Sequence, residues 1–418
     1  MKTNWPTTPK DPALFPKRAG PTGQEKLGEV CEFVRSGITP FDGEKEYIDT
    51  NSVQDFSIVK SQKITYEKRP SRANMEAKTN DVLVAKMKDT LKVYLATLKD
   101  EKRRVFSTGF FISRPKKNFI EPKYLFLYYS SNLFQNLKDE LARGSTQKAI
   151  NDEKLKKYFA IPLPPLKIQK RIVARVEELF EKIDKAKELR QKAKEETETI
   201  FPSALKKAFS VLKVKKEPLN QLCETIYRYP SFYGIKWKKE GIPVLRGENI
   251  RDNNLLDEDT RHYNYVDKSI NDKFPKTILK EEDLVMCVRG SIGKIAIVGN
   301  NFAGANISPN LIRIAPIHKR INSRYLLHFL SSFVTKEFFL EHTKAATIST
   351  IKASDLKNLQ ISLPPLCEQK KIVAYLDNLR EKVSKLKQIQ EEQLRDLVEL
   401  KKSILDRAFS GKSINEKK

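Results

Sequence analysis

Two segments, 161–210 and 361–410, carry the most regular pattern of apolar and polar positions in the chain. In each, apolar residues recur at alternating steps of four and three, and mostly polar residues fill the positions between them. A 3.5-residue period held for about four heptads is typical of a coiled-coil seam. The alternative, an amphipathic helix on a globular core, usually shows a wider apolar stripe. The pattern therefore predicts two long helices of about 42 residues, each roughly 63 Å long at 1.5 Å per residue.

The predicted seam keeps one frame in both helices. Its apolar members are Ile172, Val176, Leu179, Ile183, Ile200, Ile372, Leu376, Leu379, Val383, Leu386, Leu397, Leu400 and Ile404. A folded segment separates the two helices in one chain, so an antiparallel intramolecular pair is the simplest closure. Pro202 interrupts the first helix, and proline removes a backbone donor and clashes with the preceding turn. We therefore expect a kink or an early end near 200–201, and a first helix shorter than the second.

The two helical segments are copies of each other at an offset of 200 residues. Each opens on Leu-Pro-Pro-Leu, at 163–166 and 363–366, and each ends on Ala-Phe-Ser, at 208–210 and 408–410. The prolines hold the opening extended and mark a boundary before the helix. A repeat this long exceeds the units of a solenoid, which run about 20–50 residues. It indicates a duplicated module that does one job at two places.

The segments between the helices have an α/β pattern. Runs 81–85, 92–96, 283–288 and 294–298 are typical of strands, and 123–131 and 324–332 of core helices. Gly290-Ser291-Ile292-Gly293-Lys294 lacks the spacing of a phosphate-binding loop, so we expect a hairpin turn there. The predicted fold class is α/β: two globular α/β domains separated by two long helices that form an antiparallel intramolecular coiled coil, with a pseudo-twofold internal repeat.

The net charge of the chain indicates the class of molecule that it binds. Lys and Arg number 79 against 53 Asp and Glu, a formal net charge of +26 that is spread over all segments. Such an excess favours a polyanion or an anionic membrane surface. No apolar run is long enough to span a bilayer, the N-terminus lacks the apolar core of a signal peptide, and the four cysteines form no CxxC pair. We expect a cytoplasmic protein that binds nucleic acid, although lysine-rich surfaces also serve solubility and thermostability.

Motifs for catalysis are absent from the sequence. It contains no GxGxxG, HExxH or GxSxG, and no Asn-Pro-Pro-aromatic or Asp-Pro-Pro-aromatic loop of the kind found in adenine methyltransferases. We therefore expect no catalytic residue, no metal site and no cofactor in this chain. This result favours a binding protein.

Candidate DNA contacts are polar, basic or aromatic residues on predicted loops and turns. Arg, Lys, Asn and Gln can read base edges, while Lys, Arg, Ser and Thr also contact phosphates. The candidates in the first half are Lys86, Lys88, Lys92, Arg103, Arg104, Arg143, Ser145, Thr146, Gln147 and Lys148. Those in the second half are Arg228, Tyr233, Lys236, Lys238, Arg246, Asn249, Arg289, Lys294, Thr347, Ser349, Thr350 and Lys352. Helix caps and ordinary solvated loops remain the alternative for these residues.

The chain resembles the specificity subunit of type I restriction–modification enzymes over essentially its whole length. The paired proline-rich openings, Glu368-Gln369 in the second copy, the long helices and the stretch 241–250 carry the resemblance. Lys167-Ile168-Gln169 departs from the usual Glu-Gln pair in the first copy. The implied organisation is a target recognition domain at 1–160, a conserved helical region at 161–215, a second recognition domain at 216–360 and a second conserved region at 361–418.

The resemblance also implies a function. Each recognition domain would bind one half of an asymmetric bipartite site in double-stranded DNA, and the coiled coil would set the spacer. Two methylation subunits would dock on the conserved regions, and two restriction subunits would complete the complex. S-adenosylmethionine, ATP and Mg would be held by those partner subunits. Two other functions stay open: a self-contained methyltransferase or nuclease, and a noncatalytic coiled-coil scaffold whose basic charge is incidental.

Overall fold

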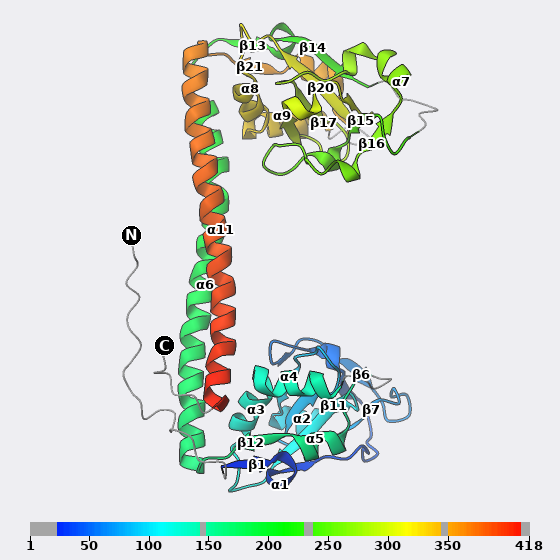
Figure 1. Cartoon of the computed structure of the whole chain (residues 1–418), viewed down its shortest axis with the longest axis vertical. Coiled ribbons are helices and arrows are strands. Elements are labelled where there is room, and N and C mark those ends of the chain that lie inside the picture. Colours follow the sequence, from blue (N-terminus) through cyan, green and yellow to red (C-terminus); the bar gives the residue numbers. More distant parts are fainter. Residues whose placement is uncertain (1–22, 143–147, 230–236, 344–349, 411–418) are drawn as a thin grey trace. The chain divides into compact units, whose positions relative to one another are not determined.

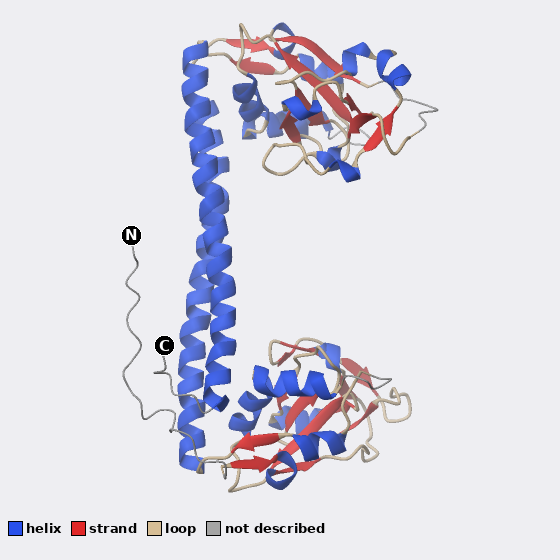
Figure 2. Ribbon diagram, viewed as in Figure 1, coloured by secondary structure: helices blue, strands red, loops and turns tan. Residues whose placement is uncertain are grey.

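The computed structural model describes residues 23–142, 148–229, 237–343 and 350–410. The chain divides into two compact units, Met1–Arg190 with Glu392–Lys418 and Gln191–Glu391. Both units mix helices and strands (Figure 2). No helix in the described ranges combines the length and the apolar character needed to cross a membrane.

The described residues of unit 1 form two four-stranded sheets and two short ladders. One sheet has the order β2-β11-β8-β9 and the other β6-β3-β10-β7, while β1 pairs with β12 and β4 with β5. The strands are β1 (Gln24–Lys26), β2 (Cys31–Phe33), β3 (Lys45–Ile48), β4 (Val53–Gln54), β5 (Ser57–Ile58), β6 (Gln62–Ile64), β7 (Ala73–Met75), β8 (Val82–Ala85), β9 (Val93–Leu95), β10 (Arg104–Ser107), β11 (Phe110–Pro115) and β12 (Ala160–Pro162). The strands predicted at 81–85 and 92–96 are confirmed as β8 and β9.

The core of unit 1 lies on both faces of the β8 sheet. Val82 and Val84 face the helices, and Leu83 and Ala85 face the second sheet, as the two-residue period of a strand requires. The helices are α1 (Leu27–Val30), α2 (Leu98–Arg103), α3 (Pro122–Ser130), α4 (Asn132–Leu141) and α5 (Asp152–Tyr158), with the 3₁₀ helix η1 (Thr50–Ser52). The core helix predicted at 123–131 is α3.

Unit 2 repeats this arrangement. Its four-stranded sheet has the order β14-β20-β17-β18, its second sheet the order β16-β15-β19, and β13 pairs with β21. The strands are β13 (Lys216–Pro218), β14 (Cys223–Arg228), β15 (Ile242–Leu245), β16 (Asn264–Val266), β17 (Leu284–Cys287), β18 (Ile295–Ile297), β19 (Asn306–Ile307), β20 (Leu311–Pro316) and β21 (Gln360–Ser362). The predicted strands and the hairpin between them are confirmed as β17 and β18.

The helices that the described residues of unit 2 form between its strands are α7 (Lys268–Asp272), α8 (Ser323–Leu330), α9 (Phe333–Thr343) and α10 (Ala353–Lys357), with the 3₁₀ helices η2 (Leu219–Gln221), η3 (Gly247–Asn249), η4 (Thr260–His262), η5 (Pro275–Thr277) and η6 (Asn300–Phe302). Three of them, α8, α9 and α10, follow β20 in the same order as α3, α4 and α5 follow β11 in unit 1, whereas η4, α7 and η5 have no counterpart there. The core again lies on both faces of the sheet, with Leu284 and Met286 toward the helices and Val285 and Cys287 away from them. The predicted core helix at 324–332 is α8 (Figure 1).

The two long helices are α6 (Leu166–Ser210) and α11 (Leu366–Ser410), each of 45 residues. Each unit holds one part of each helix. In unit 1, Lys401 pairs with Asp184 at 2.5 Å and lies over the ring of Phe180. In unit 2, Lys194 pairs with Glu391 at 3.0 Å and the amide of Gln390 donates to Thr197 Oγ1 at 3.0 Å. Within unit 2 the partners along α6, Lys194, Thr197 and Phe201, meet Glu391, Gln390 and Arg380 of α11 in turn, so the helices run antiparallel there.

The predicted seam is buried along part of its length. Ile172, Val176, Ile183, Leu376 and Val383 are less than one-tenth exposed, and Leu179, Ile372, Leu379, Leu397 and Ile404 are half-buried. The prediction is wrong for Ile200, Leu386 and Leu400, which are 39%, 39% and 47% exposed. Near the C-terminal end of each helix the buried stripe moves by one residue, to Leu205 and Leu405, because these ends pack on a globular domain as well as on the other helix.

Pro202 does not end α6, so the predicted early end is wrong and the two helices are equal in length. Pro202 is exposed, and water can therefore satisfy the carbonyl of Glu198 that loses its helical donor. The residues around it hold the helix in place. Phe201 lies under the guanidinium of Arg380 at 4.5 Å, and Leu205 and Phe209 belong to the core of unit 2.

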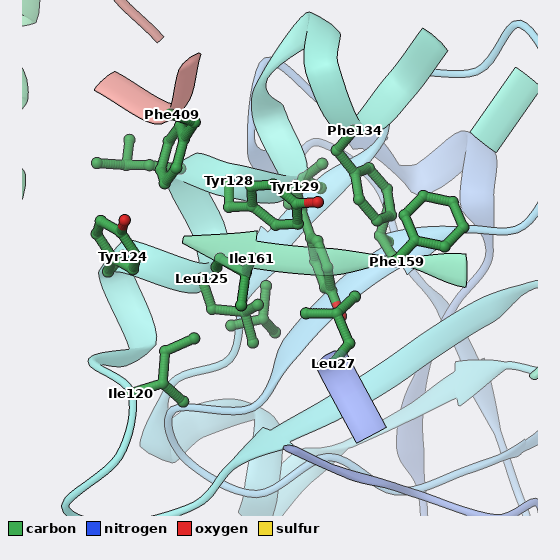
Figure 3. Close-up of a cluster of buried hydrophobic side chains, with 14 of the residues drawn as sticks. Leu27, Ile120, Tyr124, Leu125, Tyr128, Tyr129, Phe134, Phe159, Ile161 and Phe409 are labelled. Carbon is green, nitrogen blue, oxygen red and sulfur yellow. The ribbon is translucent and has the colours of Figure 1, made fainter. Parts of the chain in front are cut away.

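The C-terminal ends of the long helices complete the two cores. Phe409 of α11 packs on Tyr124 and Tyr128 of α3, with ring centroids 5.0 and 5.4 Å apart (Figure 3). In unit 2, Phe209 of α6 packs in the same way on α8, 5.5 Å from Tyr325. The repeated Ala-Phe-Ser of the sequence therefore marks a packing site. In unit 1 this site joins the last helix of the chain to its first domain.

The repeated glutamine after each proline pair fixes the start of each long helix. The amide of Gln169 donates to the carbonyls of Phe119 and Pro164 at 3.0 and 2.8 Å, and its oxygen accepts the N–H of Glu121. Gln369 does the same in unit 2 with Arg320, Pro364 and Asn322. Both side chains are fully buried, so their polar atoms need these partners. This explains why the glutamine is kept although the two residues before it differ between the copies.

A buried histidine gives unit 2 an expected pH dependence. His328 of α8 is fully buried and its Nε2 lies 2.7 Å from the carboxylate of Asp377. Burial, with a contribution from nearby Arg380, lowers the pKa of His328 below its usual value. The unfolded chain therefore binds the proton more readily. The stability from the neutral side chain is complete above a pH of about 6.5 and declines as the pH falls below it.

The matched variant is His328→Leu, because leucine occupies the corresponding position, Leu127, in α3 of unit 1. We expect calorimetry of the full chain to show a melting temperature that falls between pH 7.5 and 5.5, and a smaller fall for His328→Leu. Equal slopes for the two proteins would contradict this assignment.

Candidate nucleic-acid interface

A polar cavity of about 690 Å³ opens on unit 2, where several predicted DNA contacts meet. It lies between the end of β15, the β17–β18 turn and the segment before β20. Its lining residues are Trp237, Arg246, Gly247, Glu248, Asn264, Cys287, Arg289, Ser291, Lys294, Ser308, Pro309 and Asn310. We call this cavity the reading pocket. Arg246 precedes Arg289 and Lys294 by more than 40 residues in the sequence, and the fold brings it next to them.

Local backbone geometry places Arg246. The residue follows β15, and its N–H donates to the side-chain oxygen of Asn249 at 2.8 Å, which forms the turn into η3. The Arg246 guanidinium lies 2.9 Å from the carboxylate of Glu248 and its side chain is 42% exposed. Because the carboxylate of Glu248 is also exposed, the Arg246 guanidinium can turn to a ligand without leaving a buried carboxylate unpaired.

The β17–β18 turn places Arg289 and Lys294. Its two glycines have positive φ angles, +80° for Gly290 and +83° for Gly293. At Gly293 a Cβ atom would also lie 3.1 Å from the ring of Phe339, so this turn requires glycine. Arg289 forms an isolated antiparallel bridge with Thr350, which ties the turn to the segment before α10.

Positive charge gathers at this pocket. Arg228 donates its Nε–H to the carbonyl of Pro309 at 2.8 Å, and Pro309 lines the pocket. Burial, with a contribution from the nearby charge of Arg289, lowers the pKa of Arg228 below its ordinary range. The side chain of Trp237 is also available, because the residue is 48% exposed.

These side chains suit the edges and backbone of a nucleic acid. A guanidinium can donate two hydrogen bonds to the O6 and N7 of guanine, and Asn264 and Asn310 offer the amides that pair with adenine. Ser291 and Lys294 are suited to phosphate oxygens. The described residues contain no group of three or more His, Cys, Asp or Glu arranged to hold a metal ion.

Sheet register identifies the corresponding positions in unit 1. Ile48 faces Phe106 across a parallel ladder, as Leu245 faces Ile307 in unit 2. The residue that follows Ile48 is Asp49, which therefore corresponds to Arg246.

The neighbouring turn is matched in the same way. Ala85 pairs with Phe110 as Cys287 pairs with Leu311, and Met87 forms an isolated bridge with Ala149 as Arg289 does with Thr350. Met87 therefore occupies the position of Arg289, and Lys92 that of Lys294.

The two domains thus present opposite chemistry at equivalent positions. Where unit 2 has the donor Arg246, unit 1 has the acceptor Asp49, whose carboxylate accepts the hydroxyl of Ser52 at 2.7 Å. Where unit 2 has Arg289, unit 1 has Met87, which is 45% exposed. Only the lysine at the third position is shared. The scaffold is common to both domains, and the side chains that it presents differ.

The structure removes two predicted residues from the set of DNA contacts. Arg104 is paired with Glu46 at 2.8 Å and with Asp100 at 2.7 Å, and its side chain is 11% exposed. Asn249 is 1% exposed and is engaged by the backbone of Arg246. For both residues the prediction is wrong, because their polar groups are satisfied inside the domain.

Other predicted contacts lie on the surface without forming one site. Lys86 pairs with Asp152 at 3.4 Å, Lys88 with Asp89 at 3.5 Å and Lys238 with Asp267 at 2.5 Å. Arg103, Lys148 and Lys352 are exposed, and Lys92 and Thr350 are half-buried. Arg143, Ser145, Thr146, Gln147, Tyr233, Lys236, Thr347 and Ser349 lie outside the described residues. All of these stay predictions.

Sequence reasoning missed Asp49, Asn264 and Asn310 as candidate contacts. An acidic residue is a weak candidate in a basic protein, and the two asparagines lie outside any basic cluster. One signal was available for Asp49. Aligning Tyr47-Ile48-Asp49 with Val244-Leu245-Arg246 in the repeat would have placed it opposite Arg246.

Comparison with known proteins gives a consistent result. The sequence matches the family described as Type I restriction modification DNA specificity domain over residues 23–195 and again over 213–395. The type I restriction enzyme EcoBI specificity subunit of Escherichia coli is 26% identical over 279 residues, 60% of this chain and 58% of that protein, so the match spans little more than half of that subunit's length. The putative type I restriction enzyme MjaX specificity subunit of Methanocaldococcus jannaschii is 24% identical and aligns over 93% of this chain and 92% of that protein.

Solved structures extend the comparison to the fold. The HsdS subunit from Thermoanaerobacter tengcongensis has a TM-score of 0.64 and 28% identity, with 94% of this chain and 97% of that chain covered. A chain solved for the complex assembly and conformational transition of the type I R-M system has a TM-score of 0.71 and 27% identity, with 93% and 98% covered. Because the family match takes in a helix-and-sheet domain from each half of the sequence, this chain belongs to the type I restriction modification DNA specificity family and carries its domain twice.

Proposed function

We propose that this specificity subunit binds an asymmetric bipartite site in double-stranded DNA, one half with each recognition domain. The observation that carries the proposal is the pair of equivalent positions that hold Asp49 in unit 1 and Arg246 in unit 2. A common scaffold gives both domains the same approach to a groove, while an acceptor and a donor select different base edges. Arg246 and Arg289 suit guanine, and Asp49 suits the amino group of cytosine.

The long helices act in this proposal as an antiparallel intramolecular coiled coil that sets the spacer between half-sites. The contacts of α6 with α11 inside each unit support this role. Two of them are related by the repeat: Lys401 lies over Phe180 in unit 1, and Arg380 lies over Phe201 in unit 2. Buried Gln390, bonded to Thr197, supplies a polar contact of the kind that fixes the register of a coiled coil.

The proposal assigns chemistry to partner subunits and recognition to this chain. Two methylation subunits dock on the helical regions 161–215 and 361–418, and two restriction subunits join the full complex. S-adenosylmethionine, ATP and Mg belong to those subunits. The recognition domains take the predicted bounds 1–160 and 216–360, and the complex works in the cytoplasm, where its DNA substrate lies.

The test is to map methylated adenines in cells that express this chain with its methylation subunits. We expect one motif with two specified halves and an unspecified spacer of fixed length. Replacing residues 217–360 by the matching segment of a relative should change one half and leave the other intact. A change in both halves would contradict modular reading. A chain that binds its partners, shows a flat salt dependence toward DNA and directs no motif would instead be a scaffold.

A further inference from the structure

A second cavity of unit 2 lies where the recognition domain meets the long helices. Its volume is about 740 Å³, and its walls come from α6, α8, α9, α11, the 251–254 loop and the β17–β18 turn. Six basic residues line it, and Asp252 is the acidic residue among the described lining. The basic residues are Lys206, Arg251, Lys294, Lys336, Arg380 and Lys387. We call this cavity the basic cleft.

Unit 1 has a cavity at the equivalent place, with the opposite charge. Its volume is about 530 Å³, and it includes Phe180 and Asp184 of α6, which correspond to Arg380 and Ser384 of α11. Its charged lining residues are Glu177, Glu181, Asp184 and Lys123. Both copies of the repeat thus have a cavity at this place, but the charges that line it are opposite. The scaffold therefore does not require the positive charge of the basic cleft.

The cations of the basic cleft are only partly compensated by carboxylates: Arg251 pairs with Asp257 at 2.5 Å. Neither Lys336 nor Lys387 makes an ion pair within the described residues, and Lys294 lies 3.8 Å from a fully exposed Asp252 carboxylate. Arg380 is half-buried between the ring of Phe201 and the carbonyl of Asn253, to which it donates at 3.1 Å. Burial lowers the pKa of Arg380, the charge of Asp377 opposes this shift, and the neighbouring charge of Arg324 adds to it. A cleft lined by one sign of charge concentrates the opposite charge.

The basic cleft adjoins the reading pocket. Lys294 lines both cavities, and the β17–β18 turn forms a wall of each, with Arg289 and Ser291 on one side and Ile292 and Gly293 on the other. A duplex held in the reading pocket therefore has its sugar-phosphate backbone next to the entrance of the cleft. Lysine side chains on flexible stems suit such contacts, because they neutralise phosphate without reading bases.

We propose that the basic cleft of unit 2 binds the phosphodiester backbone of the DNA whose bases the reading pocket contacts, and that unit 1 has no counterpart to this clamp. The inference rests on the proposed function, since it needs DNA in the reading pocket. It adds an asymmetry: the second half-site is held by base edges and by a sequence-independent charge contact, and the first by its bases without this contact. An acidic segment of a partner subunit is the competing occupant.

The test uses the full chain in complex with its methylation subunits and a duplex that carries the mapped motif. Lys336→Gln with Lys387→Gln should leave the motif unchanged and reduce the slope of log affinity against log salt by about two, since each phosphate contact contributes about 0.9. Lys117→Gln with Lys319→Gln removes the same charge from exposed loop positions of the two recognition domains, outside both cavities of unit 2 and the acidic cavity of unit 1, and should leave the slope unchanged.

Neutral methylphosphonate linkages locate the contact on the DNA. Placed one at a time through the second half-site and its flanks, they should weaken binding of the unsubstituted protein at a few adjacent positions and have no effect there on the double variant. An unchanged slope with weaker binding of the methylation subunits would overturn the proposal in favour of an acidic partner segment. An unchanged slope with intact assembly would overturn it outright. If the unsubstituted complex methylated no bipartite motif, the proposed function would fail instead.

Discussion

Replacing Arg246 and Arg289 together by alanine is expected to abolish methylation of the motif by removing recognition of its second half. Both guanidinium groups line the reading pocket, and each can donate two hydrogen bonds to guanine. A bidentate contact of this kind is worth about 1–3 kcal/mol, so losing two should weaken specific binding roughly 30-fold to 10⁴-fold. Each single variant should retain partial binding and accept more than one base at one position.

Methylated-adenine mapping in cells and binding of the purified complex to duplex variants would measure these effects. Asp49→Ala is the complementary variant, expected to relax a position in the other half of the site. Arg261→Ala is the matched control, because its side chain is 84% exposed and pairs locally with Asp259. Retention of the full motif by the Arg246 and Arg289 double variant would contradict their role as base contacts, whatever its effect on affinity.

Shortening both long helices by one heptad is expected to change the spacer or to abolish binding. Removing residues 187–193 and 392–398 keeps the seam frame, because seven residues make one full repeat. It also keeps the pairs on either side of the deletion, Asp184 with Lys401 and Lys194 with Glu391. At 1.5 Å per residue the helices lose about 10 Å, close to the rise of three base pairs.

The helical twist of DNA limits which spacers the shortened protein can accept. Three base pairs turn the duplex by roughly 100°, so a domain that keeps its old orientation no longer faces its groove. Mapped motifs should therefore show a spacer shorter by about three base pairs, or none at all. The control replaces the same fourteen residues by heptads of equal length, which should preserve the spacer. A shortened chain that methylates the original motif would contradict the role of the helices as a ruler.

The helices could be predicted from sequence because their physics is local and periodic. Between Ile172 and Thr197 the predicted frame includes the buried residues Ile172, Val176, Ile183 and Thr197, in a stretch where apolar spacing decides which face is buried. It is wrong at Ile200, because beyond that point a globular domain competes with the other helix for the buried face. Pro202 misled the prediction for a related reason. Its cost is real, but tertiary packing of Phe201 and Leu205 holds the helix across it.

The residues of the reading pocket could be predicted from the sequence less well than the helices could. Arg246 and Arg289 were among the candidates because they are basic residues on predicted loops and turns, and the fold places both on one cavity. Charge alone could not separate these from Arg104, whose two carboxylate partners come from β3 and α2. The parallel pairing of β3 with β10, which places Asp49, joins residues 58 apart in sequence and leaves no local pattern.

The packing of Phe409 on Tyr124 and Tyr128 has a consequence for how this protein is made. The first domain leaves the ribosome early, yet part of its core arrives almost 250 residues later, with Leu405, Ala408 and Phe409. Asp406 adds to this dependence, because its carboxylate accepts both the backbone N–H and the side-chain amide of Asn132 at the start of α4. Synthesis must pass Phe409 before the first domain can complete its core, so a chain interrupted before Leu405 leaves that domain with an open apolar surface.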